Sequence, residues 1–234
     1  MKRFLIILLF STNVFGQNEP ENVIYKGFYN LSFLVDNPIG NYKKSLKSDF
    51  VKSSNSGLSL SYLGNPKRKM GDLSSILLGG ELGFVGRRQS VFSAPAPGSD
   101  FYMTHRQFWT NAKIRYLPNL AINKVLTYVD ASFGPKFYTS KMMENVGEEE
   151  IYKVYGYNSV ALNYGIESGL EYKISGDKRP FSYLNVGVGY TQSNAAKTID
   201  RNRVGFTQDY EVIEAIKAVK PQSFYIKLGL TSYL

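Results

Sequence analysis

The amino-acid sequence predicts an all-β fold: an eight-stranded antiparallel up-and-down transmembrane β-barrel with short periplasmic turns and long extracellular loops. Three observations predict it. Eight segments alternate apolar or aromatic residues with glycine, small polar or charged residues. The connections between them alternate between short and long, and no apolar run is long enough to form a membrane-spanning helix.

Composition excludes several classes of site. Among 234 residues there is no cysteine and one histidine, His105. Disulfide frameworks, thiolate metal sites, cysteine nucleophiles and multi-histidine metal sites are therefore excluded. A disordered chain is excluded as well, because 43% of the residues are hydrophobic and 15% are aromatic. We expect no cofactor and no metal site.

The N-terminus resembles a targeting signal. Two basic residues, Lys2 and Arg3, precede an apolar run over residues 4–10, and the small subsite residues Val14 and Gly16 follow. This pattern predicts a secretory signal peptide over residues 1–16, cleaved after Gly16, and a barrel domain over residues 17–234. A transmembrane anchor would need about 20 apolar residues. Because the chain is exported, we expect no nucleic-acid partner despite its net charge of +9.

The eight strands are predicted from period-two alternation, in which apolar residues share one face of a strand but would scatter around a helix. The sixth segment is the clearest. A bulge is expected at Pro135 in the fifth, because proline removes a hydrogen-bond donor. The apolar phases, in chain order, are Tyr25, Tyr29, Leu31, Phe33, Val35; Leu58, Leu60, Tyr62; Ile76, Leu78, Leu82, Phe84; Phe108, Ala112, Ile114, Tyr116; Val129, Ala131, Phe133, Phe137; Val160, Leu162, Tyr164, Ile166, Leu170, Tyr172, Ile174; Leu184, Val186, Val188, Tyr190; and Phe224, Ile226, Leu228, Leu230.

The connections place short turns at one rim of the barrel and long loops at the other. The short connections are residues 65–74, 118–124 and 175–180, and the long ones are 36–56, 88–103, 139–157 and 193–221. Within the longest loop, residues 209–220 have early acidic and late basic residues and end at Pro221, which favours a short helix. Extension of the flanking strands is the alternative.

Two barrel types fit the alternation. A soluble barrel of the lipocalin kind buries its apolar face, whereas a membrane barrel turns it outward. Outward placement is favoured by the long and short loops, and by the mixture of glycine, small residues and both charge signs in the polar phase. It is also favoured by aromatic residues near strand ends, where a girdle meets lipid headgroups: Tyr62, Phe84, Phe108, Tyr116, Tyr172, Tyr190 and Phe224.

Together, the signal peptide, the eight alternating strands and a last strand running from Phe224 to the C-terminus resemble the small eight-stranded outer-membrane β-barrels of Gram-negative bacteria. That family includes the OmpA transmembrane domain and OmpX-like proteins. The chain ends in Tyr233-Leu234, whereas the assembly signal of the family usually ends in an aromatic residue. The resemblance implies a fold and a location in the cell outer membrane; it transfers no catalytic or binding residues.

In an eight-stranded barrel the lumen is only wide enough to be filled by side chains. Since buried charges must be paired, we predict a structural ion-pair network that plugs the lumen; gating or proton-linked permeation is the alternative. The predicted members are Lys26, Glu81, Arg87, Lys113, Arg115, Asp130, Lys136, Glu167, Glu171, Lys173 and Lys227. The expected pairs are Glu81 and Asp130 with Lys113 or Arg115, and Glu167 or Glu171 with Lys136.

Three further features have weaker functional interpretations. His105 could act as the base of a Ser/His lipid hydrolase, but no serine adjoins it, so we interpret it as an ordinary rim residue and expect no catalytic residue. Glu144 and residues 148–150 lack the spacing of a calcium loop. Basic residues could touch lipopolysaccharide at one rim and anionic periplasmic headgroups at the other: Lys43, Lys44, Lys47 and Lys52, and Lys67, Arg68 and Lys69.

The sequence as a whole predicts an integral outer-membrane protein that is not an enzyme, with a structural or surface-interaction role carried by its extracellular loops. Outer-membrane lipids and lipopolysaccharide are the expected partners, together with a protein at the loops. Three alternatives remain: a narrow porin-like channel for small or apolar molecules, an accessory component of protein secretion, and a lipid-modifying outer-membrane enzyme.

Overall fold

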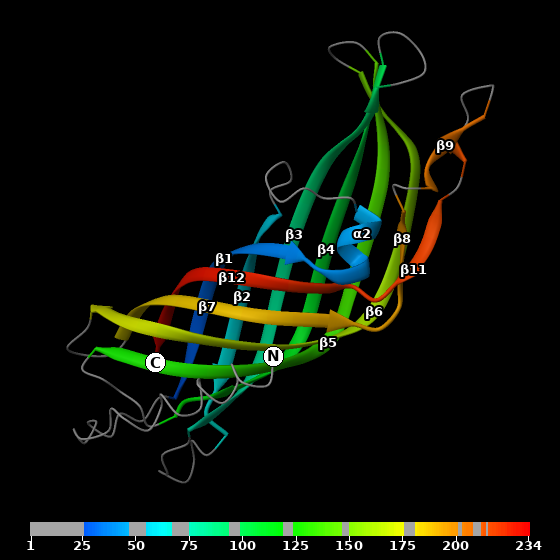
Figure 1. Ribbon diagram of the computed structural model, residues 1–234. Helices are drawn as coiled ribbons and strands as arrows, with labels where there is room; N and C mark the ends of the chain where they lie inside the picture. Colours follow the sequence, from blue (N-terminus) through cyan, green and yellow to red (C-terminus); the bar gives the residue numbers. More distant parts are fainter. Residues whose placement is uncertain are drawn as a thin grey trace.

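The predicted fold class is confirmed by a computed structural model, in which eight antiparallel strands form a closed barrel (Figure 1). The order around the barrel is β1-β12-β7-β6-β5-β4-β3-β2, so each strand lies beside its neighbour in the up-and-down path and β1 closes against β12. The structure describes residues 26–46, 55–66, 75–93, 99–118, 124–146, 150–175, 181–200, 203–207, 212–213 and 215–234. The predicted signal peptide, residues 1–16, lies outside these ranges and stays a prediction.

The barrel strands vary in length, and the longest are consecutive in the chain. Four of them, β3 to β6, extend well past the rest. The bounds are β1 Gly27–Pro38, β2 Ser56–Gly64, β3 Ile76–Ser93, β4 Ser99–Tyr116, β5 Val125–Val146, β6 Glu150–Ser175, β7 Phe181–Ser193 and β12 Gln222–Tyr233.

The apolar phase of the strands points outward, as predicted. On β12, Phe224 and Leu228 are 55% and 52% exposed, whereas Lys227 between them is 3% exposed. The aromatic residues near the strand ends form outward-facing pairs, such as Tyr190 with Phe224 (ring centroids 5.4 Å apart). A continuous apolar outer surface bordered by aromatic residues belongs in hydrocarbon, so the strands span a membrane. Within the described ranges, no helix has the length and apolar character needed to cross a bilayer.

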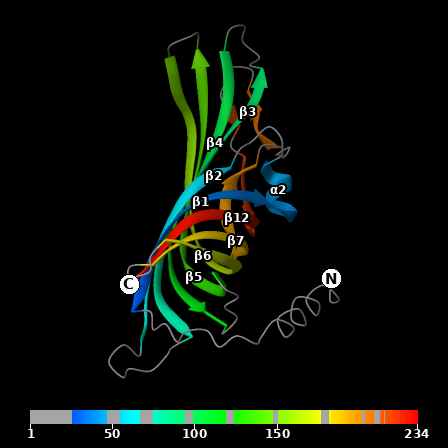
Figure 2. The same cartoon turned by 90° about the vertical axis from the view of Figure 1, so that its left-hand side faces the viewer.

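Beyond the girdle, β3 to β6 continue as a projecting sheet (Figure 2). The connections predicted over residues 88–103 and 139–157 are therefore mostly strand, and the links between strands shorten to residues 94–98 and 147–149. Two neighbouring antiparallel strands can keep pairing after they leave the membrane, because each new pair satisfies backbone groups that would otherwise face water. The lengths of these connections were overestimated for that reason.

The helix predicted over residues 209–220 is wrong. The described parts of this segment are the short strands β10 (Val212–Ile213) and β11 (Ile216–Val219), which pair with β9 (Gly205–Phe206) and β8 (Ala196–Ile199). Pairing with β8 gives β11 backbone hydrogen bonds and buries Val219, and β-branched residues suit a strand.

Within the part of the chain that the structure describes, one helix forms, α2 (Gly40–Leu46), and it was not predicted. It begins at Gly40, whose φ of 59° suits the tight turn after β1. The helix turns Tyr42 and Leu46 inward against Val219 of β11, and the Tyr42 ring meets Tyr138 edge-on at 6.5 Å. α2 therefore lies over the outer end of the lumen.

The bulge expected at Pro135 is also absent. Pro135 pairs with Leu162 in unbroken register, and on its other side the pairing passes from Trp109 opposite Lys136 to Ala112 opposite Phe133 without a shift. A residue in an antiparallel strand donates its N–H to one neighbour only, so the missing donor removes one bond and requires no inserted residue. Register shifts occur instead at Ser90/Phe92, Met142/Met143 and Lys173/Ser175.

The outward orientation can be tested at the middle of β12. Leu228→Arg should lower the free energy of unfolding in lipid bilayers by about 2–4 kcal/mol, because the guanidinium would sit at the bilayer midplane. Equilibrium urea unfolding of the refolded protein measures the change. The control is Val154→Arg, on the projecting part of β6 outside the membrane, which should change the value by less than about 0.5 kcal/mol. Equal effects of the two variants would contradict a lipid-facing β12.

Candidate functional site: the barrel interior

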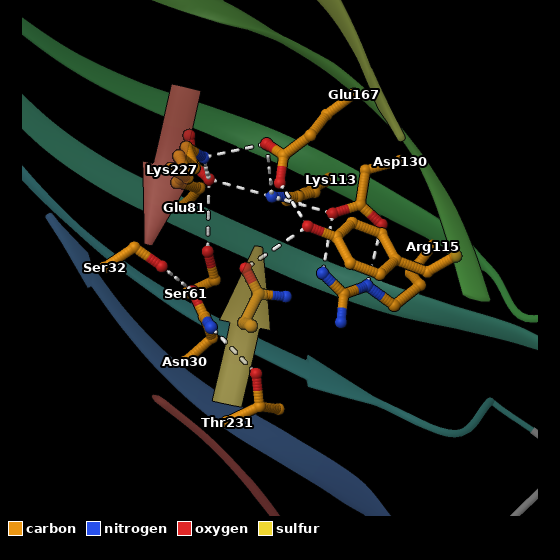
Figure 3. Close-up of polar contacts among 12 residues, drawn as sticks. Asn30, Ser32, Ser61, Glu81, Lys113, Arg115, Asp130, Glu167, Lys227 and Thr231 are labelled. Carbon is orange, nitrogen blue, oxygen red and sulfur yellow. Dashed lines mark hydrogen bonds and ion pairs between the residues drawn. The ribbon is translucent and has the colours of Figure 1, made fainter. Parts of the chain in front are cut away.

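The centre of the lumen holds a compact ion cluster contributed by five strands (Figure 3). The Lys113 ammonium lies 2.9 Å from carboxylate oxygens of both Glu81 and Asp130, and 3.6 Å from Glu167. The Lys227 ammonium approaches the same Glu81 at 2.7 Å and Glu167 at 2.9 Å. Each lysine therefore bridges acids on different strands, and the cluster cross-links the barrel wall from inside.

Arg115 occupies the layer next to this cluster, toward the end of the barrel with the short turns. Its guanidinium makes two hydrogen bonds to Asp130, at 2.7 and 2.9 Å, and a third to Glu171 at 2.5 Å. The guanidinium carbon also lies 3.7 Å from the centre of the Tyr128 ring and 4.4 Å from that of Phe28. Bidentate pairing and ring stacking together compensate the lost hydration of a fully buried arginine.

Tyrosine hydroxyls complete the cluster. Tyr128 and Tyr225 donate to Glu167 at 2.8 and 3.0 Å, and Tyr233 donates to Glu171 at 2.5 Å. Glu167 and Glu171 thus have neutral donors as well as cations, which satisfies lone pairs that the cations leave free. These phenols face inward because they occupy the polar phase of β5 and β12, where a phenol fills volume and still ends in a polar group.

The predicted network residues do not all lie in the same part of the barrel. Seven lie buried in the interior as one connected set: Glu81, Lys113, Arg115, Asp130, Glu167, Glu171 and Lys227. Lys26 instead lies exposed before the start of β1, and Lys173 is half-buried near a short turn with its ammonium 4.5 Å from the Phe181 ring centre. These two lie beyond the length of lumen that the barrel wall encloses.

Lys136 and Arg87 are buried nearer the outer end of the lumen. The expected pairing of Glu167 or Glu171 with Lys136 is wrong, because both acids lie deeper and are held by Lys113, Lys227 and Arg115. The Lys136 ammonium lies over the rings of Trp109 and Tyr138 instead, at 5.2 and 5.7 Å.

An additional buried acid, Asp36, was missed by the sequence analysis, because the first alternating segment was ended at Val35. Asp36 accepts a hydrogen bond from Ser223 at 3.3 Å and lines the same small cavity as Lys136. With Asp36 included and Lys26 and Lys173 left out, the charged side chains that the structure describes as buried in the barrel strands are five acids and five bases, and they balance. The set predicted from the sequence held seven bases and four acids, and the described interior does not show that excess of cations.

Both ends of the lumen are closed by apolar side chains. At the end with the short turns, a cluster of Phe28, Leu63, Leu77, Tyr183 and Tyr233 fills the opening. At the other end lie Tyr42 and Leu46 of α2. The cavity between them has a volume of about 20 Å³, enough for about one water molecule. A space of this size passes no solute.

Ser140 and His105 are neighbours across β4 and β5, with 2.9 Å between Ser140 Oγ and His105 Nδ1. The other ring nitrogen of His105 has no hydrogen-bond partner among the described residues, so the acid that would orient a catalytic base is missing from this part of the chain. Burial and the neighbouring Arg87 guanidinium lower the pKa of His105 to about 3, because both disfavour the imidazolium that proton abstraction would create. The arrangement does not support hydrolysis.

Other predicted features lie outside the described residues: Glu148 and Glu149, Lys47, Lys52, and Lys67, Arg68 and Lys69. Lys43 and Lys44 are described and exposed on α2. Within the described ranges, no three histidine or acidic side chains gather as metal ligands would.

The chain is similar to several solved structures of other proteins. No protein-family model and no curated protein sequence matches the chain. Neisserial surface protein A matches at 12% identity and a TM-score of 0.40, over 89% of this chain and 97% of that one. Ail, the attachment invasion locus protein of Yersinia pestis, matches at 11% and 0.45, over 91% and 100%. The outer membrane protein OprG of Pseudomonas aeruginosa matches at 10% and 0.38, over 91% and 98%. The fold is established by the closed order of the eight strands.

Removing Arg115 should be strongly destabilising. Arg115→Met leaves Glu171 without its cation and Asp130 with Lys113 alone, and we expect the free energy of unfolding to fall by about 3–5 kcal/mol. The double variant Arg115→Met, Glu171→Gln should lose less, because it removes one buried cation together with one buried anion and Asp130 keeps its contact with Lys113. Urea unfolding measures both. Lys173→Gln, at the half-buried lysine near the turn, is the control and should be close to wild type; a double variant that is less stable than the single one would contradict the role of charge compensation.

His105 should make the folded protein sensitive to mild acid. The unfolded chain binds a proton near pH 6.5, while the folded chain resists protonation until about pH 3, so acid favours unfolding. Between pH 7.5 and pH 5 the free energy of unfolding should drop by about 2 kcal/mol from this residue. His105→Gln should flatten that dependence. The imidazole proton resonances should stay constant over the same range, and a midpoint near pH 6.5 in the folded protein would refute the prediction.

Proposed function

We propose that this protein is an integral outer-membrane β-barrel whose plugged interior is structural and whose working surface is the sheet that it projects outside the membrane. The observation that carries the proposal is the division of the side chains. The outer face is apolar and bordered by aromatic rings. The described inner face carries buried acids and bases in equal number. Such a surface is unstable in water, and only helices and closed barrels satisfy their backbones in a membrane.

A surface-interaction role is supported by the projecting part of β3 to β6. Its inner face packs against β8 through a cluster of Phe101, Met103, Met142 and Ile199, with Tyr155 and Val204 at its margin. A second cluster of Tyr138, Ala161 and Ala196 joins β8 to the barrel below. The projecting sheet is thus a packed, stable structure, which is what a surface that presents loops to a partner requires.

Membrane location and fold can be tested on one preparation. The protein extracted from the outer-membrane fraction of a Gram-negative host should migrate differently on a gel before and after boiling, because a closed barrel resists detergent until it is heated. Recovery of the mature chain in the periplasm without detergent would overturn the proposal.

A plugged lumen makes a separate prediction about permeation. The purified protein in planar bilayers should give no steady conductance, because an eight-stranded lumen is filled by side chains and the cavity found at Asp36 and Lys136 has a volume of about 20 Å³. Arg115→Ala, which removes the largest fully buried side chain, is the positive comparison and should give measurable openings. Steady conductance from the wild-type protein would favour the narrow channel and contradict the plug.

A further inference from the structure

The helix α2 and the strand β11 lie near each other at the outer rim of the barrel (Figure 1). A groove lies where they meet. It has a volume of about 420 Å³, within the range of small-molecule sites. No part of the ion cluster or of the projecting sheet contributes to it. The lining residues are Asn41, Lys217, Ala218, Val219, Lys220 and Gln222.

The position of Gln222 shows where the groove lies relative to the membrane. It is two residues from Phe224 on β12, and both side chains share the outer face of that strand. Its amide donates to Gln192 on β7 at 3.0 Å, and Gln192 in turn is bonded to the hydroxyls of Tyr190 and Tyr164. These tyrosines belong to the aromatic border of the apolar surface. The groove therefore begins where the hydrocarbon ends, in the layer that lipid headgroups occupy.

The groove is basic. Lys217 and Lys220 line it and are exposed, and α2 adds the exposed Lys43 and Lys44. Lys44 follows Asn41 by three residues, so the two share a face of the helix. Among described acids, Asp200 is the ion-pair partner of Lys217, at 3.4 Å, and it is itself buried. The lining of the groove therefore holds two lysines beside one carboxylate, which leaves it positive, and the amides of Asn41 and Gln222 add hydrogen-bonding groups of both kinds.

From this combination we propose that the groove binds the phosphorylated headgroup of a lipid in the surrounding leaflet, namely the phosphates of the lipid A part of lipopolysaccharide. This rests on the proposed outer-membrane location. Lysines attract phosphate as point charges, and the amides suit the hydroxyls of a sugar. The position favours a lipid over a free anion, because a bound lipid can keep its acyl chains against Phe224 and Tyr190 while its phosphates enter the groove.

The experiment uses the full mature protein refolded in detergent micelles, with native mass spectrometry to measure lipid binding. The probe is lipid A carrying two phosphates, compared with the same lipid after enzymatic dephosphorylation. The test variant is Lys217→Gln, Lys220→Gln. The matched control is Lys141→Gln, Lys153→Gln, which removes two lysines from projecting β5 and β6, away from the groove. Gel migration before and after boiling verifies that each variant is a folded barrel.

The wild-type protein and the control should prefer the phosphorylated lipid. The groove variant should bind it about 30-fold more weakly, since each lysine beside a charged headgroup contributes about fivefold. Equal weakening in the control would overturn the proposal in favour of general charge attraction, and equal binding of the dephosphorylated lipid would overturn it in favour of acyl-chain contact.

Full competition by millimolar inorganic phosphate would assign the groove to a free anion instead of a lipid. A wild-type protein that never yields a boiling-sensitive barrel would overturn the outer-membrane proposal itself. A wild-type protein that forms a folded barrel but shows no preference for the phosphorylated lipid would overturn the lipid-binding proposal and leave the outer-membrane proposal intact. The failure of one proposal can therefore be distinguished from the failure of the other.

Discussion

The compensation of buried charge inside a narrow barrel is the constraint from which the rest of this structure follows. Lys113 and Lys227 share Glu81 and Glu167 between them, and Arg115 holds Asp130 and Glu171. An uncompensated charge at this depth would be expensive, so register, strand tilt and side-chain length must all agree for the contacts to form. Because the partners come from different strands, the cluster also determines which strands lie opposite one another across the lumen.

Because the lumen is filled by side chains, interactions with other molecules must take place on the outer surfaces of the barrel. The cavity beside Asp36 and Lys136 has room for about one water, and the ends of the lumen are closed by aromatic and apolar side chains. The remaining surfaces are the lipid-facing wall, the projecting sheet of β3 to β6 and the rim between them. The rim is where α2 and β11 close the lumen, with Tyr42 and Val219 turned inward and lysines turned outward. One pair of elements therefore seals the barrel and presents charge to the headgroup layer.

Burial in the closed outer end of the lumen also explains why His105 stays neutral. His105 lies three residues beyond the girdle residue Phe108 on β4, and its buried ring is beside Arg87 and against Ser140. In open water such a histidine would titrate near neutral pH and could act as a base. Enclosed next to a cation, it is held neutral, and the serine contact becomes part of the packing of the outer layer of the lumen.

Which side chains face lipid and which face the lumen could be predicted from the order of the residues alone. Period-two alternation, as over Val160 to Ile174, has one solution in a strand, and alternation of loop lengths supplied the topology. It could not determine which buried charges meet, since that depends on how the closed sheet is sheared and tilted. Lys136 was therefore paired with the wrong acids, and Asp36 was left out. Nor could it separate helix from strand over residues 209–220 or at α2, because short segments take the form that their tertiary partners, here β8 and Val219, make more stable.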